Sequence, residues 1–193
     1  MKRANLFILL LTTFVFTAIS CSSVKISEKQ KKAEDIVKTK IVSATTPAYF
    51  DKYFKFLPEK YSESDSDVNI VAAVKIPELE YTDTLIFRVA GNNVENFSTL
   101  RDIPDCFEDT TKCEFNINKE KLLKILKDKK LLEEHNSFIV KTIWDDKEKR
   151  FLWKVTITKE SYRVGDRVRG HGIFVFVNPA SGEIVKTEEW KVM

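Results

Sequence analysis

The spacing of apolar residues changes from a period of 3.6 to a period of 2 near residue 134, and this change constrains the fold most. Residues 119–133 carry a leucine-rich stripe at helical spacing behind Asn118, which stands where an N-cap is expected. After the helix, apolar and polar residues alternate, as in a half-buried strand, in four segments: 138–144, 151–158, 173–177 and 183–192. One helix followed by an antiparallel meander predicts an α+β domain with the helix packed on a curved antiparallel β-sheet.

The strand 151–158 shows which face of this sheet is buried. Phe151, Trp153, Val155 and Ile157 share one face, and lysine and threonine occupy the other. We expect the aromatic and aliphatic face to cover the helix, with Trp153 in the core. Residues 161–172 are polar and predict an irregular connection to the next strand.

The first half of the chain predicts a helical extension and two more strands. Residues 27–42 have helical composition with a thin apolar stripe at Ala33, Val37 and Ile41, which would suit a charged stalk. Thr46-Pro47 is typical of a helix start, whereas the aromatic segment 48–57 fits a helix or a strand equally well. Strands are expected at 69–76 and 84–89, the second followed by a turn at 91–93.

The N-terminus has the features of an export signal. Lys2 and Arg3 precede an apolar run over 6–16, and small residues lead to Cys21. This arrangement resembles a bacterial lipoprotein signal, which implies cleavage after residue 20, a lipid on Cys21 and a location in the bacterial cell envelope. No aspartate follows the cysteine, and in some bacteria this implies the outer membrane, facing the periplasm. The alternative is an ordinary cleaved signal with a cysteine nearby.

The charge of the mature chain excludes some partners. Removing the first 20 of 193 residues leaves 173, and the 32 basic residues become 30, against 29 acidic ones. A nearly neutral chain has no long-range attraction to nucleic acid, so we expect none as a partner. The acyl chains of a lipoprotein would hold it at a membrane without help from surface charge.

Two further cysteines, Cys106 and Cys113, are expected to form one disulfide. An even number of cysteines in an exported protein is typical of structural bridges. The alternative, a redox-active pair, usually has two intervening residues, and here there are six.

The helix, the strand around Trp153 and the turn Asn178-Pro179-Ala180-Ser181-Gly182-Glu183 together resemble a PepSY-type module. That family has a short helix, a central aromatic strand and a closing Gly-Glu hairpin, and its fold is cystatin-like. Asn178 stands where the family usually has aspartate. The resemblance covers about 80 residues. Together with the N-terminal features it predicts a signal peptide (1–20), a lipidated tether with a helical and aromatic extension (21–67) and a PepSY-like domain (68–193). The strands 69–76 and 84–89 lie outside the resemblance and could extend the same sheet.

The sequence contains little that points to catalysis. His135 and His171 have no partner at metal-ligand spacing, and no nucleophile elbow or phosphate-binding glycine loop occurs. The acidic residues Asp102, Asp105, Glu108, Asp109 and Glu114 do not match a calcium loop, so a solvated loop is the better interpretation. We therefore expect no catalytic residue, no metal and no cofactor.

The candidate contact surface is the segment 163–171. Arg163, Arg167, Arg169 and His171 are concentrated in a stretch expected to be exposed, and arginine is frequent at protein interfaces. A solvated hairpin loop is the plain alternative.

These features favour a non-enzymatic envelope lipoprotein that binds a protein or peptide through its sheet and loops. The PepSY resemblance implies restraint of a peptidase as one form of such binding. A small-molecule carrier or hydrolase, with a pocket between helix and sheet, is the second hypothesis. A structural tether that depends on the helix 27–41 is the third.

Overall fold

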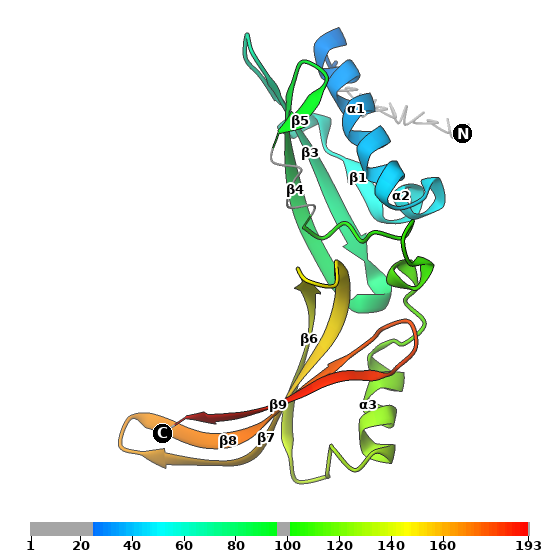
Figure 1. Ribbon diagram of the computed structural model, residues 1–193. Helices are drawn as coiled ribbons and strands as arrows, with labels where there is room; N and C mark the ends of the chain where they lie inside the picture. Colours follow the sequence, from blue (N-terminus) through cyan, green and yellow to red (C-terminus); the bar gives the residue numbers. More distant parts are fainter. Residues whose placement is uncertain (1–24, 96–100, 193) are drawn as a thin grey trace, which may run out of the picture.

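The computed structural model describes residues 25–95 and 101–192 and confirms an α+β fold in which helices pack on antiparallel sheets. The strands form two sheets, one of five strands and one of four. In Figure 1 the five-stranded sheet and helices α1 and α2 form the upper half, and the four-stranded sheet and α3 form the lower half. The first two long strands therefore do not extend the sheet of the second half.

Helix α1 (Glu28–Ala44) begins with a capping box: the Ser27 hydroxyl accepts from the Gln30 N–H, and the Gln30 side chain accepts from the Ser27 N–H. Its predicted stripe of Ala33, Val37 and Ile41 is buried, mainly against β3. This helix is therefore part of the packed body and not a free stalk.

The aromatic segment that fitted either a helix or a strand contains both. Thr46 caps the short helix α2 (Pro47–Tyr53), which buries Tyr49, Phe50 and Tyr53. The chain then extends into a short strand that pairs with β3. The predicted N-cap and first-turn proline are confirmed.

The upper sheet has the order β1-β3-β4-β5, and β2 also pairs with β3. Strand β3 is buried on the helix side at every second residue from 68 to 76. The turn at Gly91, whose φ is +60°, lies where the sequence predicts it. The short helix η2 (Pro77–Leu79) joins β3 to β4, which begins at Tyr81, three residues before the predicted start. The strands are β1 (Phe54–Phe56), β2 (Ser62–Glu63), β3 (Val68–Ile76), β4 (Tyr81–Ala90) and β5 (Asn93–Glu95).

Helix α3 (Lys119–Asp128) is shorter than the predicted 119–133. Asn118 caps its start by accepting from the Lys121 N–H at 3.0 Å. After Asp128 the chain turns at Lys130, whose φ is +58°, and the N–H groups of Leu131 and Leu132 both donate to the Leu126 carbonyl. Leu132 is buried, but by a turn that folds back and not by a further helical turn.

The lower sheet is the predicted meander, in the order β6-β7-β8-β9. Phe151, Trp153, Val155 and Ile157 are almost fully buried on the helix side, as predicted. The Trp153 indole N–H donates to the Ile117 carbonyl at 2.8 Å, which ties the sheet to the start of α3. The strands are β6 (Ser137–Asp145), β7 (Arg150–Val164), β8 (Arg167–Val177) and β9 (Ile184–Val192).

The expected irregular connection over 161–172 is wrong. Strands β7 and β8 continue to pair out to Val164 and Arg167, and a turn of two residues joins them. Gly165 takes the left-handed conformation in this turn, with φ of +60°. The polar composition misled the prediction because both faces of these strand ends carry polar side chains.

The turn between β8 and β9 docks on α3. The Pro179 carbonyl accepts from the Ile117 N–H at 2.8 Å, and the Gly182 N–H donates to the Asn178 carbonyl at 2.8 Å. Gly182 has φ of +77°, and a Cβ atom there would lie 2.7 Å from Cδ1 of Ile125. This position requires glycine for its backbone conformation and for its close approach to the helix.

We predict that Gly182→Ala lowers the free energy of unfolding by about 2 kcal/mol or more, through left-handed strain and overpacking together. Urea unfolding measures the change. Gly91→Ala is the matched control, because Gly91 has φ of +60° but no atom within 4 Å of an added Cβ, so it should cost about 1 kcal/mol. Equal losses for the two variants would contradict the close contact with Ile125.

An aromatic cluster joins the two halves. Tyr49 and Tyr53 lie 6.2 and 5.7 Å from Phe115, and Tyr81 lies 4.9 Å from Phe151, measured between ring centroids. Two polar contacts add to the junction: Thr142 donates to the Leu79 carbonyl, and Lys119 pairs with Glu80 at 2.8 Å. One hydrophobic core therefore runs through both halves.

Asp102 is buried next to this junction. It is 2% exposed, its φ is +65°, and its Oδ1 has no hydrogen-bond partner. Burial raises the pKa of the Asp102 carboxyl, and the nearby Tyr81 hydroxyl and the exposed Arg101 only partly oppose this effect.

A carboxyl whose pKa is raised on folding stabilises the protein only while it is protonated, so stability should fall as pH rises through its raised pKa. We predict that Asp102→Asn, which removes the charge and tolerates the left-handed backbone, is more stable than the wild type at pH 7. The difference should shrink as the pH is lowered towards 4. Melting temperatures across this range test the prediction. The control is Asp51→Asn on the exposed side of α2. A stability gain for Asp102→Asn that does not depend on pH would contradict the prediction.

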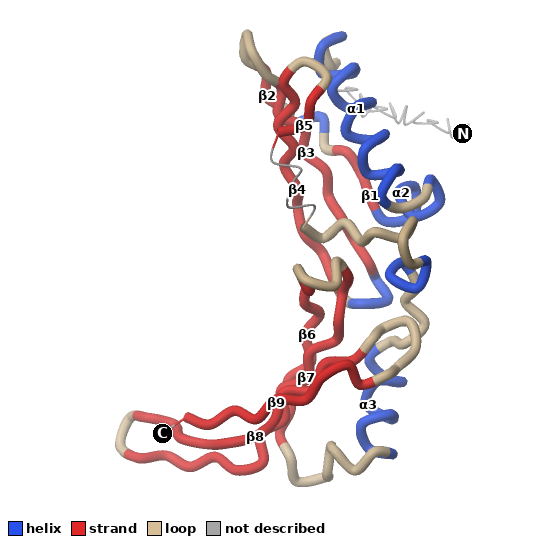
Figure 2. Tube along the Cα trace, in the orientation of Figure 1, coloured by secondary structure: helices blue, strands red, loops and turns tan. Residues whose placement is uncertain are grey.

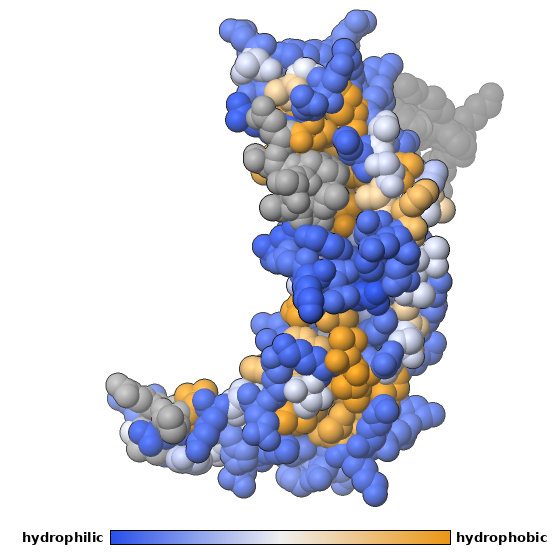
Figure 3. Space-filling model, viewed as in Figure 1, coloured by the Kyte–Doolittle hydropathy of each residue, from blue (hydrophilic) through white to orange (hydrophobic). Residues whose placement is uncertain are grey.

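Helices α1, α2 and α3 lie on one side of the two sheets (Figure 2). The opposite side is hollowed, and the ends of β7, β8 and β9 project sideways below the hollow (Figures 1 and 3). Hydrophobic residues gather in two areas of the face drawn in Figure 3, one in each half, with a hydrophilic band between them. No helix within the described ranges is long and apolar enough to cross a membrane.

Candidate binding surface

The projecting end of the lower sheet, residues 159–171, is called the arm from here on. Strand β9 supports the arm only as far as the pairing of Val192 with Gly170. Beyond that point, β7 and β8 pair with each other alone, from Tyr162 opposite Arg169 to the turn. Tyr162 is 57% exposed. A two-stranded ribbon buries little surface and is only marginally stable by itself, so the arm contributes little to the stability of the fold.

The structure brings only some of the predicted contact residues together. Arg169 and His171 lie on one face of the arm, because alternate residues of β8 point to the same side. Arg163 pairs with Val168 and therefore lies on the opposite face, where it is exposed. Arg167 lies at the tip, next to the turn, and its side chain is outside the described part of the structure.

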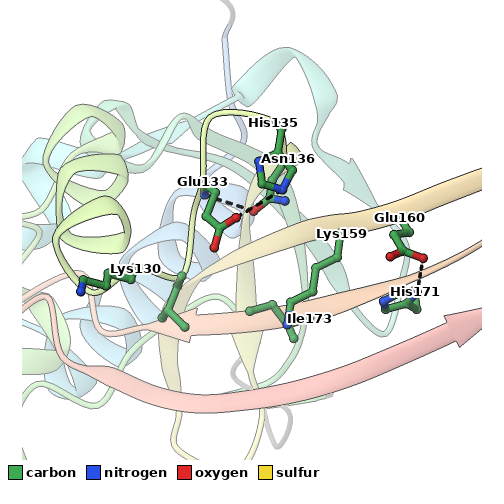
Figure 4. A pocket seen from close by; sticks show the side chains of 9 residues that line it. Lys130, Glu133, His135, Asn136, Lys159, Glu160, His171 and Ile173 are labelled. Atoms are coloured by element: carbon green, nitrogen blue, oxygen red, sulfur yellow. Dashed lines mark hydrogen bonds and ion pairs between the residues drawn. The ribbon is translucent and has the colours of Figure 1, made fainter.

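A cavity of about 280 Å³ lies at the base of the arm, and both histidines of the chain line it. It opens between the turn after α3 and the strands β7 and β8 (Figure 4). The turn contributes Lys130, Glu133, His135 and Asn136, and the strands contribute Lys159, Glu160, His171 and Ile173. We call it the arm-base cavity. A wider hollow, lined by Ser137, Tyr162 and residues 158–161 among others, continues along β7.

The arm-base cavity holds two lysines and two glutamates beside the two histidines. His135 Nε2 lies 3.2 Å from Glu133 Oε2, and His171 Nδ1 lies 3.8 Å from Glu160 Oε2, so each histidine has a carboxylate beside it. Lys130 and Lys159 have no carboxylate within 4.0 Å among the described residues. The cavity can therefore accept carboxylates of a bound molecule.

The direction of the arm depends on two glycines of β8. A Cβ atom on Gly172 would lie 1.9 Å from the Ile157 carbonyl oxygen and 2.9 Å from the Trp190 ring, and one on Gly170 would lie 2.6 Å from the Glu160 carbonyl oxygen. Both contacts arise where the pairing of β7 and β8 shifts between Thr158 and Glu160. Such a bulge bends a strand pair, and these glycines allow the close approach.

The face of the lower sheet away from α3 carries aromatic rings with lysines over them. Lys154 Nζ lies 4.2 Å from the Phe174 ring centre and 5.6 Å from that of Phe176, and Lys186 Nζ also lies 5.6 Å from Phe176. Such cation–π contacts stabilise the lysine chains and cover part of the rings.

The other predicted site residues lie away from the arm. The Cα atoms of Cys106 and Cys113 are 5.6 Å apart and the two side chains are joined in a disulfide. In the acidic segment around them, Asp109 pairs with Arg150 at 2.7 Å and Glu108 with Lys112 at 3.0 Å. No group of three or more histidine, cysteine or acidic side chains in the described ranges is placed to hold a metal ion. Cys21 and residues 1–20, where a signal peptide is predicted, lie outside the described residues.

The space between α3 and the lower sheet is filled. Leu122 and Leu126 of the helix and Val155 and Ile157 of the sheet have no exposed surface. The pocket between helix and sheet required by the second hypothesis is therefore not seen among these residues, and the cavity near His171 lies outside this core.

Sequence reasoning missed the lysines of the site and its strand geometry. Lys130 lies within the predicted helix 119–133, and Lys159 follows the predicted strand 151–158. The dipeptide Gly165-Asp166 between Val164 and Arg167 was the available signal of a hairpin. No pattern in the sequence could place His135 and His171 around one cavity, since only the tertiary fold does so.

No protein-family model, curated protein or solved structure matches this chain, so the PepSY resemblance remains a prediction from its own residues.

Proposed function

We propose that this protein is a non-enzymatic bacterial envelope lipoprotein, held to a membrane by lipid on Cys21, that binds a protein or peptide partner through the arm and the adjoining sheet. The observation that carries the proposal is the arm itself. It projects beyond the part of the sheet that α3 covers and presents Tyr162, Arg163 and Arg169 on a ribbon that buries almost nothing.

Two features of the arm suit a protein partner. Tyrosine and arginine are enriched among the residues that dominate interface energies, because they join apolar area with directional hydrogen bonding. The Nε atom of Arg169 is buried and has no hydrogen-bond partner, so a partner's acceptor would satisfy it. Lys130 and Lys159 at the arm base favour a partner with carboxylates.

Crosslinking of the full-length protein in cells, followed by mass spectrometry, tests the proposal. We predict one dominant protein partner, whose yield falls by about tenfold or more in the Arg163→Gln, Arg169→Gln double variant, because the loss of two interface arginines removes more than 1.4 kcal/mol. The matched control is the Lys124→Gln, Lys147→Gln double variant, which removes two exposed charges away from the arm. Capture of lipids and abundant bystanders alone, or equal loss in both variants, would contradict the arm as the contact surface.

The anchor is tested separately. Cys21→Ser should leave the protein unlipidated, and we predict that it then partitions with the soluble fraction of the envelope and not with membranes. Palmitate labelling and fractionation measure this. Retention of the serine variant on washed membranes would contradict a lipid anchor at Cys21.

A small-molecule carrier is the second candidate, and the arm-base cavity is the observation that favours it. The cavity is small and open, and its carboxylates Glu133 and Glu160 are 60% and 73% exposed. Groups so exposed are poorly placed for acid–base catalysis, so this cavity suits an end group of a peptide better than a hydrolytic reaction.

A further inference from the structure

The four-stranded sheet ends in a strand whose outer edge is open. Strand β6 has nine residues and pairs with β7 along its whole length, from Ser137–Thr158 to Asp145–Arg150, without a register shift. Within the described part of the chain, no backbone group of β6 bonds to any element other than β7. Every second residue of β6 therefore directs its N–H and C=O groups outward with no backbone partner.

The outer edges differ in how they are protected against pairing with another chain. At the margins of the five-stranded sheet, β1 and β5 have only three residues each. Strand β9 has a register shift, and four of its nine residues are charged: Lys186, Glu188, Glu189 and Lys191. Short edges, charges and irregular register are the usual means of preventing strand addition, and β6 has none of them before its last residue except Lys141.

The first half of β6 also exposes apolar side chains on both faces. Phe138 is 42% exposed on the helix side, and Ile139 is 58% exposed on the other side. Lys141 lies two residues further along the Ile139 face, is exposed, and has no carboxylate within 4.0 Å among the described residues. A strand that paired with this edge could therefore cover Phe138 on one face and Ile139 on the other with apolar side chains. On the Ile139 face it could also place a carboxylate beside Lys141.

The space beside the edge is open. A hollow of about 270 Å³ lies along Val140, Lys141 and Thr142, with Leu79 and residues 80–82 of the upper half on its other side. In Figure 1, β6 lies on the side of the lower sheet that borders the larger hollow of the molecule. Ser137, where β6 begins, also lines the hollow that continues along β7 of the arm. The open edge is therefore continuous with the proposed contact surface.

We propose that the 137–141 edge of β6 binds an extended segment of a partner protein by strand addition. The segment has apolar residues opposite Phe138 and Ile139 and a carboxylate opposite Lys141. Its backbone N–H and C=O groups form hydrogen bonds with the open edge of β6. Its apolar side chains cover Phe138 and Ile139, and its carboxylate pairs with Lys141. This inference rests on the proposed function, since it names the segment that the same surface recognises.

A tethered peptide tests this edge without knowledge of the natural partner. The peptide Thr-Ser-Glu-Thr-Val-Val-Thr-Ser is fused to the C-terminus of the full chain through a flexible linker of about 20 Gly and Ser residues, which gives an effective concentration in the millimolar range. Amide hydrogen exchange of β6 is the readout. We expect the outward N–H groups of residues 137–141 to exchange about tenfold more slowly than in the chain with linker alone.

Charge reversal gives the specific control. With lysine in place of the glutamate of the peptide, protection should fall about fivefold, and Lys141→Glu should restore it for the lysine peptide while weakening it for the original. Lys191→Glu on β9 is the matched variant and should change neither. Prolines at both valines of the peptide should abolish protection, because alternate residues of a strand donate to a given neighbour and one of two adjacent valines therefore supplies a ladder donor.

The outcomes separate the two proposals. Protection of β6 that is absent, or equal for all peptides, overturns strand addition even if the arm captures a partner in cells. Protection that appears without any peptide and grows with protein concentration would mean that a second copy of the chain occupies the edge, and this would overturn a partner segment. Protection of β6 together with no cellular partner would contradict the proposed function and leave the edge specificity standing.

Discussion

The described part of this protein has helices on one side of its two sheets, and the rest of the structure follows from this constraint. The apolar stripe of α1 covers β3, and that of α3 covers the strand around Trp153, so each sheet is buried on its helix side. Burial of apolar area supplies the main driving force, at about 25 cal/mol per Å². The opposite faces and the outer edges remain exposed. Charged residues and short strands protect some of them against pairing with other chains, and the others are open to binding.

The junction between the halves shows how one core serves both sheets. Tyrosines of the upper half meet Phe115 and Phe151 of the lower half, and the rings continue the core across the point where one sheet ends and the other begins. Asp102 is buried beside these rings with an unpartnered oxygen. A carboxyl that is buried with only partial compensation lowers stability at neutral pH, so the junction makes the stability of the described core depend on pH.

The arm and the β6 edge are consequences of unequal strand lengths. Strand β7 has fifteen residues and β6 has nine, so six or so residues of β7 extend past Ser137 with no neighbour on that side. The arm-base cavity forms at this step, where the turn after α3 reaches the strands. The proposed contact residues thus lie where β7 continues beyond the start of β6. There the backbone groups on the open side of β7 have no partner within the described chain.

The sequence alone determined the features of the helices, strands and turns that depend on local residue patterns. The stripe of α1, the caps at Thr46 and Asn118, the buried face of 151–158 and the turns at 91 and 178–183 were all predicted correctly, because each depends on residues close together in the chain. It failed where contacts between distant residues decide the outcome. Four features depend on which segments pack together: the division into two sheets, the early end of α3 at a left-handed Lys130, the ladder that turns 161–172 into strands, and the placement of His135 and His171 around one cavity. Local spacing records which side of an element is apolar, but only the tertiary structure decides what covers that side and which edges stay open.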